Sequence, residues 1–476
     1  MANQRIQFEE WLPDQPSVTS LRDAKNVYPT SIGYAPFSNA EDFSGNATEN
    51  LNSVFGSKYG DEVAIFAGGA TKLFKLDATD LGLDDVSKSG GYSGNTWQFA
   101  QFGGVVIAAN NQAKLQSWTI GSSTLFADLN ANAPVAKYVT VVRDFVVAAN
   151  IGGGSDTNKV QWSDINDETN WLSGTTSQSD YQLIPDGGNI TGLTGGEIGL
   201  VFLEKSIVRM SYAGSPLFFQ FDTISRGLGC LEGNSIAQYG ATSFFLSDDG
   251  FYKCDGQTVT GIGTEKVDRY FFNDADLTDL DSMSASVDPI KKLVVWNYKN
   301  VDGGRSILVY NWQLNKWSRV ITTTTGVGSI TTTGYTLEGL ESVLGYTNLE
   351  TIPASLDDRL WVGGKFLFAG FKAAKIVTFT GSTYNSELIT PDLEVGYNSV
   401  ATLVRPQIDN GSATIKVASR RELNDNIAFG SSVTTSQEGR ASIRSAGRYH
   451  RFSISPTGNW TNATSIDVDF KQQGKR

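Results

Sequence analysis

The stretch "SFFLSDDGFYKCDGQTVTGIG", Ser243–Gly263, decides the fold expected of this 476-residue chain. Its first two apolar runs, Phe244–Leu246 and Phe251–Cys254, are separated by Ser-Asp-Asp-Gly. Asp and Gly supply the backbone freedom that a tight hairpin requires. A second turn, Asp255–Gly256, leads into a third strand that begins near Thr258. The stretch therefore predicts a meander of three antiparallel strands.

The same unit recurs along the chain at intervals of about 40 to 55 residues, the pitch of four-stranded propeller blades. The six repeats begin near Val63, Val105, Phe145, Leu200, Phe244 and Leu293, and a weaker candidate begins at Lys365. The sequence thus predicts a mainly β protein with a propeller of six blades, and the weaker candidate leaves a seventh open. The alternative is a β-sandwich, because Trp-Asp and kelch signatures are missing.

The predicted propeller occupies residues 53–384. The segments before and after it have different sequence patterns. Residues 1–52 are irregular and proline-containing, and we expect them to lie extended over the fold. Residues 385–476 alternate apolar and polar side chains between short turns, which predicts a separate, basic, all-β domain. Apolar residues at helical spacing predict one short helix within Gly263–Met283.

Few residues suit metal or nucleophilic chemistry. The chain has one histidine, His450, and two cysteines, Cys230 and Cys254, so common zinc sites and histidine-dependent triads lack their side chains. Phosphate-binding, dinucleotide-binding and nucleophile-elbow motifs are missing, and we expect neither a cofactor nor an enzyme. Pairs of distant carboxylates for glycoside hydrolysis remain open.

Two groups of aspartates are candidate sites. Ser247–Gly250 is similar to the aspartate boxes of sialidase propellers, but its spacing differs, and we interpret Asp248 and Asp249 as turn residues. The acids of the predicted helix suggest a calcium loop, yet they lack the glycine and glutamate of an EF-hand, which favours a solvated helix face. Those acids are Asp274, Asp276, Asp279 and Asp281.

Charge is unevenly distributed. The net charge is −12, but from Ala401 onward 11 basic residues face 6 acidic ones, a local +5 that leaves −17 for the rest. Because residues 1–400 are this acidic, we do not expect them to bind the phosphate backbone of a nucleic acid tightly, although DNA could pass along them. No run of about 18 apolar residues predicts a membrane span, and the N-terminus lacks the apolar region of a signal peptide.

Several segments, in order and spacing, resemble the tail hub or nozzle proteins of short-tailed bacteriophages, also called packaged-DNA stabilisation proteins. The resemblance extends from about Trp11 to the C-terminus and is looser over the first fifty residues. The segments that carry it are VQWSDINDETNW (160–171), IPDGGNITGL (184–193), VFLEKSIVRMSYAGSPLFFQFDTISRGLGC (201–230), FFLSDDGFYKCDG, GTEKVDRYFF, SASVDPIKKLVVWNY, ILVYNWQLNKW and the closing AGRYHRFSISP…SIDVDF.

The resemblance implies a structural virion protein, assembled in the host cytoplasm into a homohexameric ring. Such a ring extends the DNA channel below the portal and its adaptor, retains the packaged genome and carries further tail parts such as a fibre or needle. It implies no catalytic residues. The alternative is a propeller-type tail protein that binds or cleaves glycans at the host surface.

A basic strand near the C-terminus is the candidate assembly interface. Because strand residues alternate between faces, a strand beginning at Arg448 would place Arg448 and His450 on one face and Tyr449 and Arg451 on the other. We expect these arginines to pair with carboxylates of the adaptor or of the next subunit. The candidate residues are Arg440, Arg444, Arg448 and Arg451.

If Asp248 and Asp249 are turn residues, replacing both with alanine lowers the free energy of unfolding by about 1 kcal/mol each, because turn side chains stabilise the local backbone. Thermal unfolding measures the loss. A double variant that kept its melting temperature but lost a bound metal or a hydrolytic activity would contradict the turn interpretation.

Cys230 and Cys254 are expected to be reduced, half-buried thiols, because assembly in a reducing cytoplasm does not favour disulfides. Freshly purified protein should then migrate identically on reducing and non-reducing gels. A stoichiometric intramolecular disulfide would show that the prediction is wrong.

Overall fold

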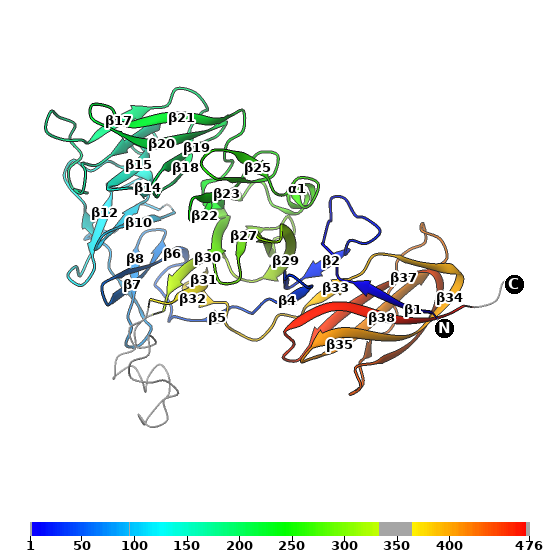
Figure 1. Cartoon of the computed structure of the whole chain (residues 1–476). Coiled ribbons are helices and arrows are strands. Elements are labelled where there is room, and N and C mark those ends of the chain that lie inside the picture. Colours follow the sequence, from blue (N-terminus) through cyan, green and yellow to red (C-terminus); the bar gives the residue numbers. More distant parts are fainter. Residues whose placement is uncertain (1, 95, 333–363, 473–476) are drawn as a thin grey trace.

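The computed structural model describes residues 2–94, 96–332 and 364–472. They form an elongated molecule with a propeller at one end and a long-stranded sheet at the other (Figure 1). Both chain termini lie at the outer end of that second body, where the first strand runs beside the last. The mainly β class and the propeller predicted from the sequence are confirmed.

Six four-stranded antiparallel sheets are separate blades. The first three are β6 (Leu51–Tyr59), β7 (Glu62–Gly69), β8 (Leu73–Leu76) and β9 (Leu83–Asp85); β10 (Gln98–Phe102), β11 (Val105–Ala109), β12 (Gln116–Thr119) and β13 (Ala127–Asp128); and β14 (Ala136–Val142), β15 (Phe145–Ile151), β16 (Asp156–Trp162) and β17 (Asp180–Leu183). The others are β18 (Ile190–Thr194), β19 (Gly199–Leu203), β20 (Ser206–Gly214) and β21 (Phe218–Arg226); β22 (Ala237–Tyr239), β23 (Thr242–Leu246), β24 (Phe251–Cys254) and β25 (Val259–Gly261); and β30 (Gly326–Thr331), β31 (Phe366–Lys372), β32 (Lys375–Thr378) and β5 (Glu41–Asp42).

A further meander occupies a place in the same ring, between the β22–β25 blade and the β30–β32 blade. It consists of β26 (Ser284–Asp288), β27 (Leu293–Lys299), β28 (Arg305–Asn311) and β29 (Lys316–Thr322), and its sheet continues beyond the propeller. The candidate at Lys365 is β31, inside a separate blade. The described ring thus contains six self-contained blades and one that is shared with the C-terminal sheet.

Each predicted repeat start marks the second strand of its blade, not the first. These second strands pack between neighbouring blades on both faces, so they read as continuous apolar runs. In β15, for example, all seven residues are buried. The innermost strands are more polar, which is why the sequence pattern does not reveal them.

The ring is closed by the N-terminal segment. β5 adds the outermost strand to the blade of β30–β32, with Asp42 paired to Val377 and Glu41 to Thr378. Closure therefore joins positions more than 330 residues apart in the chain. The extended segment expected at residues 1–52 contributes hydrogen-bonded strands to both bodies.

The 14-stranded sheet joins the propeller to the C-terminal domain. From β29 it continues through β2 (Asp23–Lys25), β33 (Glu387–Ile389), β37 (Ala441–Thr457), β34 (Leu393–Asp409), β38 (Asn462–Gln472), β4 (Tyr34–Pro36) and β3 (Val27–Pro29), with β1 (Ala2–Gln7), β35 (Ser412–Arg420) and β36 (Val433–Thr434) on branches. Its core is continuous with that of the shared blade, since Trp296, Trp317 and Phe452 belong to one buried cluster.

Ion pairs strengthen the connection at β2, the strand that lies between β29 of the propeller and β33 of the C-terminal sheet. Arg319 of β29 donates two hydrogen bonds to the Asp23 carboxylate, at 2.8 and 2.7 Å. On the other side, Lys25 pairs with Glu387 at 2.9 Å, and Ser453 donates to the same carboxylate at 2.7 Å. These side chains are mostly buried, so the pairs are shielded from solvent.

The expected helix is shorter than predicted: α1 spans Asp268–Asp274, and the 3₁₀ turn η2 (Leu280–Ser282) follows it in the chain. A second 3₁₀ turn, η1 (Gly233–Ser235), contacts β18, β23 and β26. The N-terminus of α1 is capped from a distance, because the Asp14 carboxylate accepts from the backbone N–H of Arg269 and of Tyr270, both at 2.7 Å. The acidic cluster does not form one solvated face. Asp276 and Asp279 both pair with Lys299, and Asp274 accepts from Tyr298 and Asn300.

Both cysteines are unpaired and fully buried in a cluster between the fourth and fifth blades, beside Phe202 and Phe245. Burial raises the pKa of the Cys230 thiol to about 12 and also raises that of Cys254. The sequence-based expectation of half-buried thiols is therefore wrong about their exposure. Two buried thiols with raised pKa values are poor nucleophiles.

Replacing Asp23 with asparagine should lower the free energy of unfolding by about 2 to 3 kcal/mol, because it leaves Arg319 largely buried without its carboxylate. The calorimetric transition should also split, since the propeller and the C-terminal sheet lose their shared joint. Glu197→Gln is the matched control: it removes the exposed Arg143–Glu197 pair, worth less than about 0.5 kcal/mol. Equal losses from both variants would contradict a special role for this joint.

Candidate functional site

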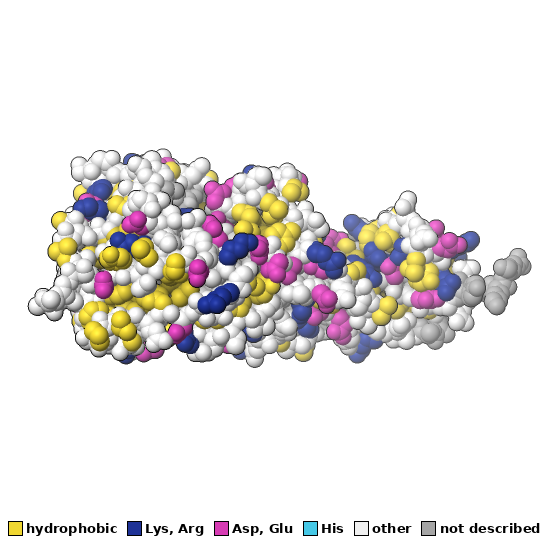
Figure 2. Space-filling view, turned by 90° about the horizontal axis from the view of Figure 1, so that it is seen from above, with side chains coloured by type: hydrophobic (Ala, Val, Ile, Leu, Met, Phe, Trp, Pro, Cys, Tyr) yellow, Lys and Arg dark blue, Asp and Glu magenta, His cyan; other side chains and the backbone are white. Residues whose placement is uncertain are grey.

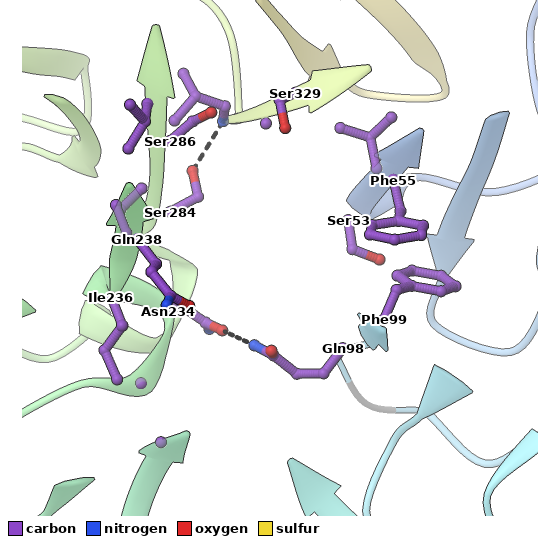
Figure 3. Close-up of a pocket in the computed structure, with 18 of the residues that line it drawn as sticks. Ser53, Phe55, Gln98, Phe99, Asn234, Ile236, Gln238, Ser284, Ser286 and Ser329 are labelled. Carbon is purple, nitrogen blue, oxygen red and sulfur yellow. Dashed lines mark hydrogen bonds between the residues drawn. The ribbon is translucent and has the colours of Figure 1, made fainter. Parts of the chain in front are cut away.

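The innermost strands of the ring surround a cavity of about 500 Å³ (Figure 3). All seven ring positions contribute to its wall, through β6, β10, β14, β18, β22, β26 and β30. Its volume lies in the range typical of small-molecule sites. The cavity is far too narrow to admit a DNA duplex, so any DNA channel must lie outside the propeller axis.

The described wall of the cavity carries no Asp, Glu, Lys or Arg, although such residues make up 18% of the chain. Polar lining comes instead from hydroxyl and amide groups, including Ser53, Gln98, Thr140, Thr194, Asn234, Gln238, Ser284, Ser286 and Ser329. Such groups both donate and accept hydrogen bonds without carrying charge. The wall is therefore suited to a neutral polar ligand or to water.

One hydrogen bond crosses the cavity. Gln98 of the second blade donates from Nε2 to Oδ1 of Asn234, at 3.5 Å, and Asn234 in turn donates to the backbone oxygen of Asp281 at 3.0 Å. Figure 3 shows this contact running from η1 to β10. Because the two blades are not neighbours in the ring, the pair narrows the cavity at this level.

An aromatic pair forms part of the wall. Phe55 and Phe99 stack with ring centroids 5.5 Å apart and planes 11° apart, and both side chains are only half-buried (Figure 3). On the opposite side, the Ser284 hydroxyl accepts from the backbone N–H of Val327 at 2.8 Å. The cavity thus places apolar rings opposite hydroxyl and amide groups.

The predicted arginines do not form one patch. Arg440 pairs with the exposed Glu438, and Arg448 pairs with Glu394 and stacks on Tyr449. Arg444 is exposed on β37 and makes no ion pair with the described residues. Figure 2 shows basic and acidic side chains interspersed over the C-terminal body. Three of the four candidates, Arg440, Arg444 and Arg448, therefore remain accessible.

Arg451 belongs instead to a buried ion cluster. It pairs with Asp392, which also accepts from Arg420 at 2.7 Å, and each of these side chains is at least 85% buried. Burial and the neighbouring Arg451 lower the pKa of Arg22, which lies close by. Arg451 therefore stabilises the domain from within, and the sequence could not show this because Asp392 lies 59 residues away.

His450 faces the interior. Its ring nitrogens lie 2.8 Å from the Ser399 hydroxyl and 2.7 Å from the Ser419 hydroxyl. Burial lowers the pKa of this imidazole to about 4. His450 is therefore buried whereas Arg448 is accessible, in contrast to the shared face expected from a strand that starts at Arg448.

Asp248 and Asp249 lie exposed in the turn between β23 and β24, where Ser247 N–H donates to Gly250 O at 2.8 Å. The second turn is an aspartate-capped loop, since Asp255 accepts from the backbone of Gln257 and Thr258. The hairpins predicted from the opening stretch are thus confirmed.

Sequence reasoning missed Asp268. Its carboxyl is buried and accepts from Phe251 N–H at 3.0 Å, and a Cβ at Gly250 or Gly263 would collide with it. Burial is the main reason that its pKa rises to about 7, and the nearby carboxylates of Asp14 and Asp249 contribute to the same rise. No local pattern marks this residue, because its partners come from a turn earlier in the chain and from the N-terminal segment.

No known protein-family model matches the chain, and no curated protein matches it either. No helix within the described residues is long and apolar enough to cross a membrane.

The Asp268→Asn variant should remove a pH dependence of stability. The native state holds a proton up to about pH 7 that the unfolded chain releases near pH 4, so stability falls as pH rises between these values. From pH 5 to pH 8 wild type should lose about 2 to 3 kcal/mol relative to the variant, because the slope is about 1.4 kcal/mol per pH unit up to about pH 7. Because His450 titrates in both proteins, its opposite contribution cancels. Parallel stability curves would contradict a raised pKa for Asp268.

Proposed function

We propose that this protein is a structural subunit of a phage tail hub or nozzle, without enzymatic activity. Six copies form a ring below the portal and its adaptor, and the lumen of that ring lets DNA pass without sequence recognition. The protein works in the virion tail, where it retains the packaged genome until ejection and carries a fibre or needle. The ordered segments that resemble the tail hub family support this role.

The observation that carries the proposal is the sheet that crosses from the propeller into the C-terminal domain. A wall that retains compressed DNA must transmit force between its parts without hinging. Here backbone hydrogen bonds, paired carboxylates and one shared core connect the two bodies. Loosely tethered domains would move relative to one another.

Charge distribution fits the same role. Residues 1–400 carry a net charge of −17, and like charge keeps DNA from adhering to a conduit as it moves. The C-terminal domain instead offers accessible arginines on β37 for carboxylates of the adaptor or of a neighbouring subunit. These contacts would set association rate and register more than affinity.

Reversing both Arg444 and Arg448 to glutamate should leave the chain folded but prevent its incorporation, giving heads that lose DNA. Single reversals should cause only a salt-dependent defect, because rim charges are screened. The measurement is DNA retention in particles assembled with each variant. Arg421→Glu, which reverses an exposed arginine outside the strand, is the control. Normal, DNA-retaining particles from the double reversal at physiological salt would contradict this interface.

A further inference from the structure

We propose that the central cavity of the propeller binds a neutral saccharide of one or two rings. This site is distinct from the arginine strand, and the inference holds independently of the hub proposal. It rests on three properties of the described cavity wall: its lack of charge, its unused hydroxyl groups and its partly buried aromatic pair.

The lack of charge selects the class of ligand. An ionised ligand buried against hydroxyl and amide groups would lose its hydration without gaining an opposite charge. A purely apolar ligand would leave the same groups without hydrogen-bond partners, which costs about 1 to 3 kcal/mol for each group. A neutral molecule with many hydroxyl groups avoids both penalties.

Unused hydroxyl groups supply the contacts. Ser286 and Ser329 line the cavity, and neither side chain makes a hydrogen bond with the described residues. Among the described residues, the side chain of Gln98 bonds only to Asn234, at a long 3.5 Å, so its amide can turn toward a ligand. Figure 3 shows these groups on different sides of the cavity, where they can reach separate hydroxyl groups of one sugar ring.

The aromatic pair supplies the apolar half of the site. A sugar ring has one face made of C–H groups, and such a face packs on aromatic rings. Phe55 and Phe99 pack against the core between the first two blades but keep part of their surface on the cavity wall, where the C–H face of a sugar can cover it.

The size of the cavity restricts the ligand further. At about 500 Å³ the space suits a monosaccharide or disaccharide but not a folded oligosaccharide. The Gln98–Asn234 hydrogen bond crosses the cavity and prevents a long glycan chain from passing through it. Only the terminal sugar of such a chain could enter. The ligand is therefore a free small sugar or a terminal sugar unit of a glycan.

Saturation-transfer NMR on the purified full chain tests the site. The probes are glucose, galactose, mannose, N-acetylglucosamine, lactose, maltose and chitobiose, with glucuronic acid as the charged comparison. At least one neutral sugar should receive saturation at millimolar concentration, most strongly on its C–H protons. Glucuronic acid should receive little. No transfer to any neutral sugar, or transfer to glucuronic acid alone, would overturn the proposal.

Two variants locate the binding. Ser286→Ala combined with Gln98→Ala should weaken the best sugar at least tenfold, because two hydrogen bonds are lost. Phe99→Leu keeps an apolar side chain at this position but removes the aromatic ring, so the C–H saturation pattern should be lost. Ser225→Ala, on the outermost strand β21, is the matched control and should bind like wild type. If the cavity variants melt normally and bind as wild type does, the sugar lies elsewhere and the proposal is wrong.

Discussion

Three residues of the N-terminal segment, Asp23–Lys25, hold the two bodies of this protein together. As strand β2 they pair with β29 of the shared propeller blade on one side and with β33 of the C-terminal sheet on the other. A short strand offers few backbone hydrogen bonds, so the largely buried Asp23–Arg319 and Lys25–Glu387 pairs carry much of the connection. Without β2 the propeller would lose its continuity with the long-stranded sheet.

The same segment organises the rest of the chain. After β2 it supplies β5, which closes the ring, and before it Asp14 caps α1 while Lys266 pairs with Glu10. These contacts fix the position of the last blade relative to the N-terminal segment. The N-terminal segment pairs with strands from distant parts of the chain, which ties the stability of both bodies to one another.

Much of the fold was predictable because strands buried on both faces have a clear sequence pattern. Phe145–Ile151, for example, is buried along its whole length and is almost entirely apolar. The sequence of β2 shows no such pattern, because β2 is short and the ion-pair partners of Asp23 and Lys25 lie 296 and 362 residues away. The site was harder still. Proximity in sequence identified the arginines, but Asp392 determines that Arg451 is buried, and the inner strands that line the cavity, such as Ser284–Asp288, look like ordinary polar loops.

The mass of the assembled protein tests the proposed role most directly. Native mass spectrometry of the purified chain should find closed rings of six 51.4 kDa subunits. Six copies agree with a wall around a DNA channel. A trimer would instead indicate a host-surface fibre protein, and a chain that stays monomeric even at high concentration and low salt would contradict the ring on which the proposed function depends.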